Sequence, residues 1–573
     1  MSRDASNSVT YRSPRRRYRA RVISAVTTCV AMVCIASAAA ASTPTGESQA
    51  NQPQVAGQPA SGSSAVFPTN KQNEPTIALN PLNSLNPVDS RFAIAGSNDE
   101  QHQPACGPGV VRGAVPPSDC SFFPGVGTSG VYTSSDSGVT WTNRGLLDDQ
   151  ASWRGKGVIS DGDPVISYGP KPDGHGVFSY GNGARAYYST LATIAGKPGL
   201  EYVVVATSDD NGVTWSPPIL AITKSATAVF NDKNWLSVDR SATSPYFGRV
   251  YLSWTQFRSN TATGNGSEPV MVTVSADGGA TFSAPKQLSP AGNNGTGNGR
   301  QGSSSSVGPD GTAYVAFEQG AAQVVTVSHD GGFSWSKAAP IGPVTDIADP
   351  IPGANFRTDS FPTIAADPRP GSTTVYASWA TRTAGGGRIV VATSTDGATT
   401  WSTPATVSSS EGSAFFQGLA VAPNGRVDVA YQALRAVHPE TFGTGNASID
   451  SYAVSKPPTG GWSVPVKLSA VSSDPAASAQ NNLQRQFWGD YNTLVSDNSG
   501  AWFISTDSRF GVGCPAVDAY QHYLVDNHLV IRDDDEVLYT GKNAPDPSTK
   551  PAPPLVCAKQ FANTDVVVAR FTP

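Results

Sequence analysis

Short apolar runs, each closed by a polar turn, follow one another along most of the chain. Tyr202-Val203-Val204-Val205 is one such run, and Pro309-Asp310-Gly311 is one such turn. β-Branched and aromatic residues bounded by Gly, Pro, Asn and Asp are typical of short β-strands and hairpins. No long stretch with helical periodicity follows residue 41. The pattern predicts an all-β fold.

The predicted strands form groups of four: an inner strand, a second, a third that ends in a polar turn, and a fourth. The expected inner strands are 75–79, 164–168, 235–238, 302–307, 361–365, 418–421 and 491–495. The expected second strands are 92–95, 177–180, 250–254, 313–317, 375–379, 427–431 and 502–505. Outer pairs are complete in only about six groups. Residues 566–571 are therefore expected to supply the seventh third strand, and a strand near the N-terminus to close the last group.

The turn between third and fourth strands repeats one motif, Ser-x-Asp-x-Gly-x-Thr-Trp. Its Ser and Asp side chains can bond turn amides, its Gly supplies a positive φ, and its Trp can cover the edge of a small sheet. The fifth copy has Ala398 in place of the glycine, and a sixth, 455–462, keeps little beyond its ends. Such repeats indicate a modular array. The aspartates of the five recognisable copies are Asp136, Asp210, Asp277, Asp330 and Asp396.

This motif resembles the Asp-box of the sialidase superfamily, and its copies span most of the chain after residue 41. The resemblance implies a β-propeller built from four-stranded antiparallel blades, with the Asp-boxes on the face opposite the active site. The number of strand groups favours seven blades. Sialidases have six, so a six-bladed propeller is the alternative.

Residues 1–41 differ from the rest of the chain. Six arginines between residues 12 and 21 precede an apolar run over 22–41 that ends in three alanines, which is typical of a cleaved signal peptide. The alternative is an uncleaved anchor helix, although the run is near the minimum spanning length. We expect a secreted, extracellular protein with a flexible leader over 42–66, rich in Ser, Thr, Gly, Gln and Pro, and a propeller over 67–573.

Composition and charge narrow the range of partners. Charged residues make up 14% of the chain, and 57 Gly and 45 Pro favour turns over helices. Loss of residues 1–41 removes seven arginines and one aspartate, which takes the formal net charge from −5 to −11. An acidic, lysine-poor chain binds nucleic acids and anionic membranes poorly, so neither nucleic acid binding nor stable membrane insertion is expected. The expected partner is a glycan or polysaccharide bound by a monomer.

Four cysteines remain after residue 41. An even number in an exported chain indicates disulfides, and nearest-neighbour pairing predicts Cys106–Cys120 and Cys514–Cys557. Each pair lies in one of the two longest connections between a second and a third strand, 98–130 and 508–562. These insertions are expected to wall a substrate pocket, the alternative being that the disulfides only restrain long loops. No Cys or His spacing indicates a zinc site, and no cofactor is expected.

Polar side chains precede the inner strands, where a propeller places them around its central funnel. A water-filled axis tolerates polar groups without a function, so only part of the set is expected to touch a ligand, with Asp163 and Asp232 as candidates for substrate binding. The set is Glu74, Asp161, Asp163, Asp232, Lys233, Arg300, Arg357, Asp359, Gln417, Arg485, Asp490 and Tyr491.

Tyr491 is the main catalytic candidate. The segment 489–494, Gly-Asp-Tyr-Asn-Thr-Leu, is similar to the Tyr-Ser-x-Leu segment that opens the last blade of sialidases, where the Tyr is the nucleophile. A neutral phenol primed by a carboxylate suits a sugar whose anomeric carbon carries a carboxylate, because an anionic nucleophile would be repelled. Asp490 or Glu318 could prime it. The alternative is a tyrosine that only packs at the start of a strand.

The rest of the sialidase pattern is partly missing. In the family the first blade begins Phe-Arg-Ile-Pro, and its Arg binds the substrate carboxylate, whereas the stretch here is Gln-Asn-Glu-Pro at 72–75. By resemblance the general acid is an Asp in the first upper loop, where Asp99 is the candidate ahead of Glu100 and Asp119. Three other arginines precede inner strands and could form a cationic cradle: Arg300, Arg357 and Arg485.

Three functions follow from these features. The leading hypothesis is a sialidase-like glycoside hydrolase of the exo-α-sialidase type, which releases a terminal acidic sugar. The second is a non-catalytic glycan-binding or scaffold propeller, favoured by the missing Arg and the additional blade. The third is a polysaccharide lyase acting on a uronate, to which His522 and His528, near Tyr520 and Tyr523, could contribute. The acidic run 533–536 is read as a solvated turn, with a calcium site as the alternative.

Overall fold

The computed structural model describes most of the chain after residue 41. Of the two compact units, Met1–Ala38 and Ala39–Pro573, the second contains every described residue, so the expected signal peptide lies outside them. No described helix is long and apolar enough to cross a membrane. The described residues are 42–53, 71–84, 91–103, 125–223, 225–226, 228–258, 266–290, 300–347, 350, 357–436, 442–479, 483, 486–527, 557–558 and 560–572.

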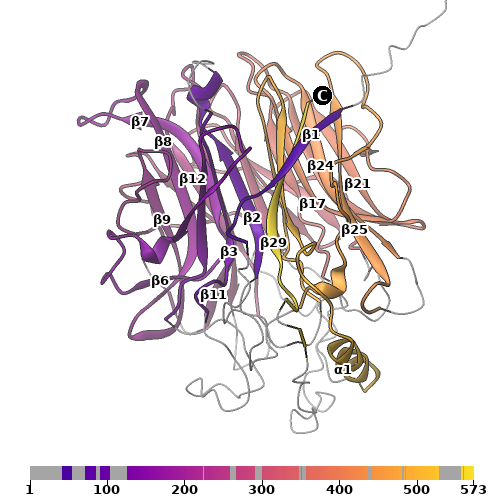
Figure 1. The fold of residues 1–573 in the computed structure, drawn as a ribbon. Coiled ribbons are helices and arrows are strands. Elements are labelled where there is room, and N and C mark those ends of the chain that lie inside the picture. The colour runs from indigo at the N-terminus through magenta and orange to yellow at the C-terminus, as the bar shows by residue number, and fades with distance from the viewer. Residues whose placement is uncertain are drawn as a thin grey trace, which may run out of the picture. The chain divides into compact units, whose positions relative to one another are not determined.

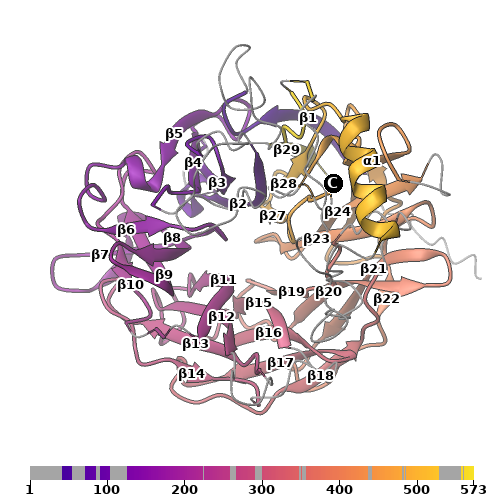
Figure 2. The ribbon, with the colours of Figure 1, turned by 90° about the horizontal axis from the view of Figure 1, so that it is seen from below.

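Seven antiparallel sheets surround a central axis, as Figure 2 shows. The first sheet contains β2 (Gln72–Leu79), β3 (Ala93–Asp99), β4 (Ser129–Ser134) and β5 (Thr142–Leu146). The second contains β6 (Val158–Ser160), β7 (Val165–Pro172), β8 (Phe178–Ile194), β9 (Lys197–Ser208) and β10 (Ile219–Leu220). The third contains β11 (Val229–Val238), β12 (Val250–Arg258), β13 (Val270–Ser275) and β14 (Lys286–Gln287).

The remaining four sheets follow around the axis in chain order (Figure 2), and Figure 1 shows the sheets from the side. The fourth contains β15 (Arg300–Val307), β16 (Ala313–Gln319), β17 (Ala322–Ser328) and β18 (Ala339–Pro343). The fifth contains β19 (Thr363–Ala366), β20 (Val375–Thr383), β21 (Gly386–Ser394) and β22 (Ala405–Thr406). The sixth contains β23 (Ser413–Val421), β24 (Val427–Ala436), β25 (Ala447–Lys456) and β26 (Val466–Lys467). The seventh contains β27 (Thr493–Ser496), β28 (Ala501–Asp507), β29 (Asp565–Thr572) and β1 (Thr43–Gln49).

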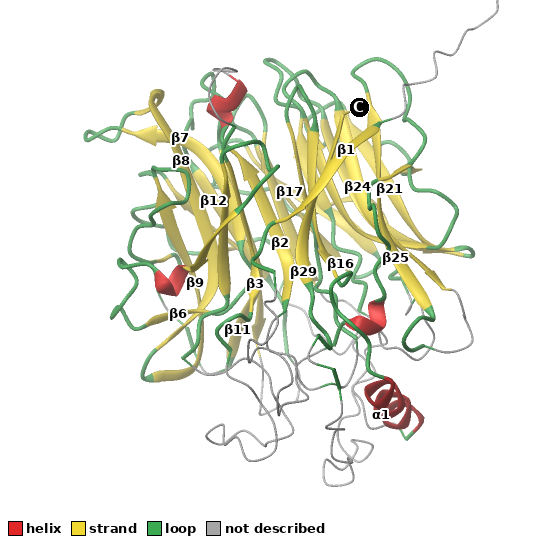
Figure 3. Ribbon diagram, in the orientation of Figure 1, coloured by secondary structure: helices red, strands yellow, loops and turns green. Residues whose placement is uncertain are grey.

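This arrangement is a seven-bladed β-propeller, which confirms the predicted fold class and the larger of the two blade counts. Helical structure is sparse among the described residues (Figure 3). It consists of the 3-10 helices η1 (Pro81–Ser84), η2 (Leu147–Asp149) and η4 (Pro475–Ala477) and the α-helix α1 (Pro515–Asp526). Helix α1 lies in the insertion between β28 and β29, where Cys514 and Cys557 form the predicted disulfide. Cys106 and Cys120 lie outside the described residues.

Strand β1 closes the ring. It pairs antiparallel with β29, from Thr43 opposite Thr572 to Gln49 opposite Val567. The side chain of Arg509 adds a bidentate bond to Glu47, with N···O distances of 2.8 and 2.9 Å. This confirms the expected closing strand, and the start of the segment that composition predicts to be a flexible leader, 42–66, is therefore part of the seventh sheet.

Each Asp-box is a clamped hairpin turn, as its motif predicts. In the second sheet the Ser208 hydroxyl donates to Asp210 at 2.8 Å and accepts from the Gly212 amide at 2.8 Å. Asp210 also accepts from the amide of Thr214 at 2.9 Å and from its hydroxyl at 2.6 Å. Equivalent bonds recur around Asp136, Asp277, Asp330 and Asp396.

The apolar core lies between neighbouring sheets. One cluster joins Val203 of β9 in the second sheet to Leu236 and Trp254 of the third, and Trp254 is fully buried. Asn80 follows β2 and donates to Asn211 of the second Asp-box at 2.7 Å, so the boxes lie where the inner strands end. The polar residues that precede the inner strands consequently lie at the other end of the axis.

Candidate functional site

Irregular starts of the inner strands position the candidate site. In four inner strands, the pairing with the second strand shifts register at this point. Such β-bulges redirect side chains. Non-glycine residues rarely adopt positive φ, and where they do the strain marks a candidate functional position. The residues with positive φ at these starts are Glu74 (53°), Asp163 (52°), Lys233 (51°), Gly302 (66°) and Phe416 (51°).

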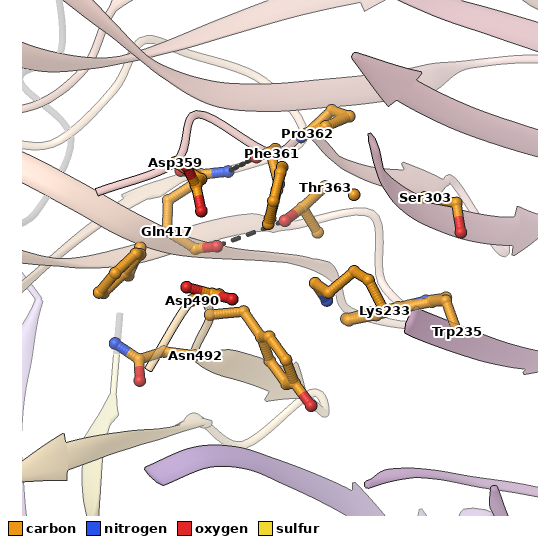
Figure 4. A pocket seen from close by; sticks show the side chains of 13 residues that line it. Lys233, Trp235, Ser303, Asp359, Phe361, Pro362, Thr363, Gln417, Asp490 and Asn492 are labelled. Carbon is orange, nitrogen blue, oxygen red and sulfur yellow. Dashed lines mark hydrogen bonds between the residues drawn. The ribbon is translucent and has the colours of Figure 1, made fainter. Parts of the chain in front are cut away.

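A pocket opens at this end of the axis, bordered by the third to seventh sheets. Figure 4 shows Lys233 entering it from β11 and Asp490 from the segment before β27. The cavity measures about 20 Å³, which is room for about one water molecule. Its lining is Lys233, Trp235, Gly302, Ser303, Asp359, Phe361, Pro362, Thr363, Phe416, Gln417, Asp490, Tyr491 and Asn492.

Tyr491 lines this pocket and is almost fully buried, with 6% of its surface exposed. Its hydroxyl donates to the backbone oxygen of Pro164 at 3.5 Å, and its ring meets Trp235 edge to face at 6.4 Å. Burial raises the phenol pKa well above its usual value, and the nearby charges of Asp163 and Glu74 raise it further. In this state the phenol is protonated.

Lys233 crosses the pocket and covers Tyr491. Its Nζ lies 3.5 Å from the centroid of the Tyr491 ring, 4.9 Å from that of Trp235 and 5.9 Å from that of Phe361. A cation above aromatic faces is attracted by their quadrupoles. Burial lowers the Lys233 pKa, and the surrounding carboxylates, led by Asp163, oppose that shift.

Three carboxyl groups meet beside Lys233. Burial raises the pKa values of Glu74 and Asp232 well above their usual values, and the nearby charge of Asp163 raises both further. Asn98 donates to Glu74 at 2.7 Å. Within the described part of the chain, no group of three or more Asp, Glu, His or Cys has the geometry to hold a metal ion.

Arg357 lies at the same end of the axis. It forms a bidentate ion pair with Asp490, both N···O distances being 2.5 Å. Glu74 and Asp359 lie farther from it, at 4.0 and 3.7 Å, and its guanidinium stacks 5.0 Å from the Phe487 ring. Asp490 therefore neutralises the positive charge that Arg357, as part of the predicted cationic cradle, would offer to a substrate carboxylate.

Asp99 and Glu318 lie outside the pocket lining. Asp99 is buried and accepts hydrogen bonds from Tyr132 at 2.6 Å and from Gln72 at 2.9 Å, so it holds the first sheet together. Glu318 accepts from Gln323 at 3.1 Å. Burial raises the pKa of both carboxyl groups.

The structure thus gathers only part of the predicted site. Five predicted residues meet at the axis: Tyr491, Asp490, Arg357, Asp163 and Asp232. The side chain of Arg300 and all of Arg485 lie outside the described residues. The sequence predicts that Lys233 and Glu74 lie around the funnel but indicates no role for them, because the bulges that direct them inward leave no pattern in the sequence.

The residues considered for a lyase lie in the insertion between β28 and β29. The His522 Nε2 lies 2.9 Å from the Phe442 carbonyl oxygen, and its ring stacks on that of Phe442 at 3.9 Å. Tyr520 is buried in the core formed by helix α1, whereas Tyr523 is exposed. His528 and the acidic run 533–536 lie outside the described residues.

Comparison with known proteins gives a family match over residues 201–441, to the BNR repeat-like domain. No curated protein sequence matches the chain. Among solved structures, a protein of unknown function from Dyadobacter fermentans has 12% identity and a TM-score of 0.37, covering 73% of this chain and 99% of its own. An intramolecular trans-sialidase from Ruminococcus gnavus has 14% identity and a TM-score of 0.37, covering 65% and 94%. A GH93 α-L-arabinofuranosidase of Fusarium graminearum has 14% identity and a TM-score of 0.36, covering 65% and 93%.

Proposed function

Because the chain is a sialidase-like propeller with BNR repeats, we propose that it is a glycoside hydrolase that removes a terminal sugar in the axial pocket, with Tyr491 as the nucleophile. The observation that carries this proposal is the convergence of Tyr491, Asp490 and Arg357 at one end of the axis, opposite the Asp-boxes. Polar groups converging on a pocket, with perturbed pKa values, are typical of active sites.

In the proposed reaction the Tyr491 oxygen bonds to the anomeric carbon while the bond to the leaving-group oxygen breaks. The phenol proton passes to a neighbouring carboxylate, for which Asp163 and Asp490 are the candidates. The leaving oxygen takes a proton from an acid, and water later cleaves the bond to Tyr491. Asp359 lines the pocket with 34% of its side chain exposed, which suits the acid better than the buried Asp99.

An acidic terminal sugar is the proposed substrate. Among the described residues, Arg357 has the guanidinium group that would bind the sugar carboxylate. On binding, the sugar carboxylate would replace Asp490 as the ion-pair partner of Arg357. Hydrolysis of acidic and neutral aryl glycosides, compared side by side, tests this assignment. Faster turnover of a neutral glycoside would contradict the acidic sugar as the substrate, whereas the proposal that the protein is a glycoside hydrolase would stand.

Substitution of Tyr491 tests the mechanism. We expect Tyr491→Phe to lower kcat on an aryl glycoside by about 10³-fold or more, because the variant has no oxygen to bond to the anomeric carbon. The matched control is Tyr452→Phe, which changes a tyrosine stacked on Tyr431 in the sixth sheet and should keep wild-type kcat. Full activity of Tyr491→Phe, with the control intact, would rule out the nucleophile.

A glycan-binding propeller without turnover is the second candidate. The seventh blade and the absence of an arginine at 72–75 favour it, because both depart from the sialidase pattern. Calorimetric binding of a glycan that the protein leaves uncleaved, as shown by mass spectrometry, would select this function.

We also propose that the protein is exported. The disulfide between Cys514 and Cys557 supports this, because such bonds persist in oxidising compartments. The arginine-rich and apolar pattern of residues 1–41 is a second, independent support.

A further inference from the structure

Lys233 is a charged side chain held within a group of aromatic rings. Its Nζ lies 3.5, 4.9 and 5.9 Å from the centroids of Tyr491, Trp235 and Phe361, which come from the seventh, third and fifth sheets. The closest of these rings is the one that the proposed function uses. Lys233 itself is buried, with 4% of its surface exposed.

The backbone of Lys233 is fixed in a conformation that few side chains adopt. Its φ of 51° lies in the left-handed region. Its amide donates to Asp163 at 2.7 Å and to Asp232 at 2.8 Å, so two carboxyl groups hold the bulge in place. Strain maintained by its surroundings points to a role for the strained residue.

We propose that Lys233 is a positioning residue for Tyr491: its ammonium group holds the ring and stabilises negative charge on the phenol oxygen as Tyr491 reacts. The inference rests on the proposed function, in which Tyr491 is the reacting group. It adds a lysine to a site for which sequence analysis considered only carboxylates as partners of the tyrosine.

The charges around Tyr491 explain why a cation is needed. Asp163, Glu74, Asp490 and Tyr188 face it from the second, first, seventh and second sheets, and all four disfavour a phenolate. Among the described residues, Lys233 is the cation that lies over the ring of Tyr491. An ammonium that lies 3.5 Å from the centroid of a buried phenol ring attracts the full negative charge of a phenolate more strongly than it attracts the neutral ring.

A titration without substrate tests the proposal. A polyfluorinated tyrosine, whose phenol is acidic enough to ionise while Lys233 still carries its proton, is placed at position 491 and followed by ¹⁹F NMR against pH. We expect Lys233→Met to raise the titration midpoint by about one pH unit or more, because the ionised phenol loses its cation. Lys233→Arg should keep the midpoint close to that of wild type. The matched control is Lys197→Met, at an exposed lysine that begins β9.

Two results would overturn the proposal. One is an unchanged or lower midpoint in Lys233→Met. The other is a changed ¹⁹F chemical shift with an unchanged midpoint, which would show that Lys233 only packs against the ring. Lys233→Gln replaces Lys233→Met if the latter does not fold.

Activity separates this inference from the proposed function. If the wild type hydrolyses a glycoside, Lys233→Met should lower kcat by about 10-fold or more with little change in KM, and Lys233→Arg should restore part of it. If no glycoside is hydrolysed, the proposed function fails, while the titration still decides whether Lys233 governs Tyr491.

Discussion

In the first four Asp-boxes a glycine lies against the preceding sheet. A Cβ on Gly332 would come within 2.6 Å of Val274 in the third sheet, and one on Gly212 within 3.0 Å of Ile94 in the first. The fifth box has Ala398 at this position with φ 68°, so a left-handed backbone alone does not exclude a methyl group. Each box therefore joins two sheets as well as forming its own turn.

Gly332→Ala tests this contact. Gly371→Ala is the matched control, because Gly371 also has positive φ (75°) but has open space around it. We expect Gly371→Ala to lower the free energy of unfolding by about 1 kcal/mol. Gly332→Ala should cost about 1–3 kcal/mol more, because its methyl group meets a neighbouring sheet. Equal losses in urea unfolding would show that the sheets do not meet tightly at Gly332.

The role of Lys233 at the residue scale could not be predicted from sequence. Its neighbours Asp232 and Asn234 are polar and give no apolar periodicity. Its contact with Tyr491 joins positions 258 residues apart in the chain and depends on a bulge of backbone conformation. Tyr491 itself was found because its Gly-Asp-Tyr-Asn-Thr-Leu segment resembles a known one.

The strands differ in how well the sequence predicts them. The inner and second strands were predicted because Val, Ile, Leu and aromatic residues mark their buried faces. Strand β1 has no apolar residue, and its first four residues are exposed. Its stability comes from backbone pairing with β29 and from the pairing of Glu47 with Arg509, which composition cannot reveal.

Asp565, the first residue of β29, gives this closing element a pH dependence. Burial raises its pKa to about 7, although Asn51 and Gln49 donate to it at 2.8 and 2.6 Å. A carboxyl group whose pKa is raised by folding stabilises the fold while it is protonated. That stability is lost as the pH rises from the unfolded-state pKa, about 4, toward 7.

Asp565→Asn should remove the loss of folding stability that the ionisation of Asp565 causes as the pH rises. We expect the variant to be more stable than wild type by about 1 kcal/mol or more at pH 8, with little difference at pH 4. Thermal unfolding at the two pH values measures it. A variant that is destabilised equally at both values would show that Asp565 acts only as an acceptor for Asn51 and Gln49.

At the scale of the whole molecule, the two ends of the axis have separate tasks. The Asp-boxes clamp the sheets where the inner strands end, and the charged residues gather where these strands begin. Motif spacing and the known layout of sialidases were enough to predict this division. They could not predict which charges meet, because Glu74, Asp163 and Asp232 belong to three different sheets and come together only after the ring has formed.

Ring closure also restricts the processing that the proposed export requires. Because β1 begins at Thr43, cleavage after Ala41 leaves the closing strand intact. We expect N-terminal sequencing of protein from the culture medium to begin at Ser42. A mature protein that begins beyond Gln49 would lack β1 and contradict this expectation.

Thr43 and Thr572 lie opposite each other in the seventh sheet, so the polypeptide comes almost full circle. Joining these two positions with a short peptide would produce a chain without a natural starting point. New termini could then be opened between any two neighbouring blades, and such circular permutants would carry the same axial pocket.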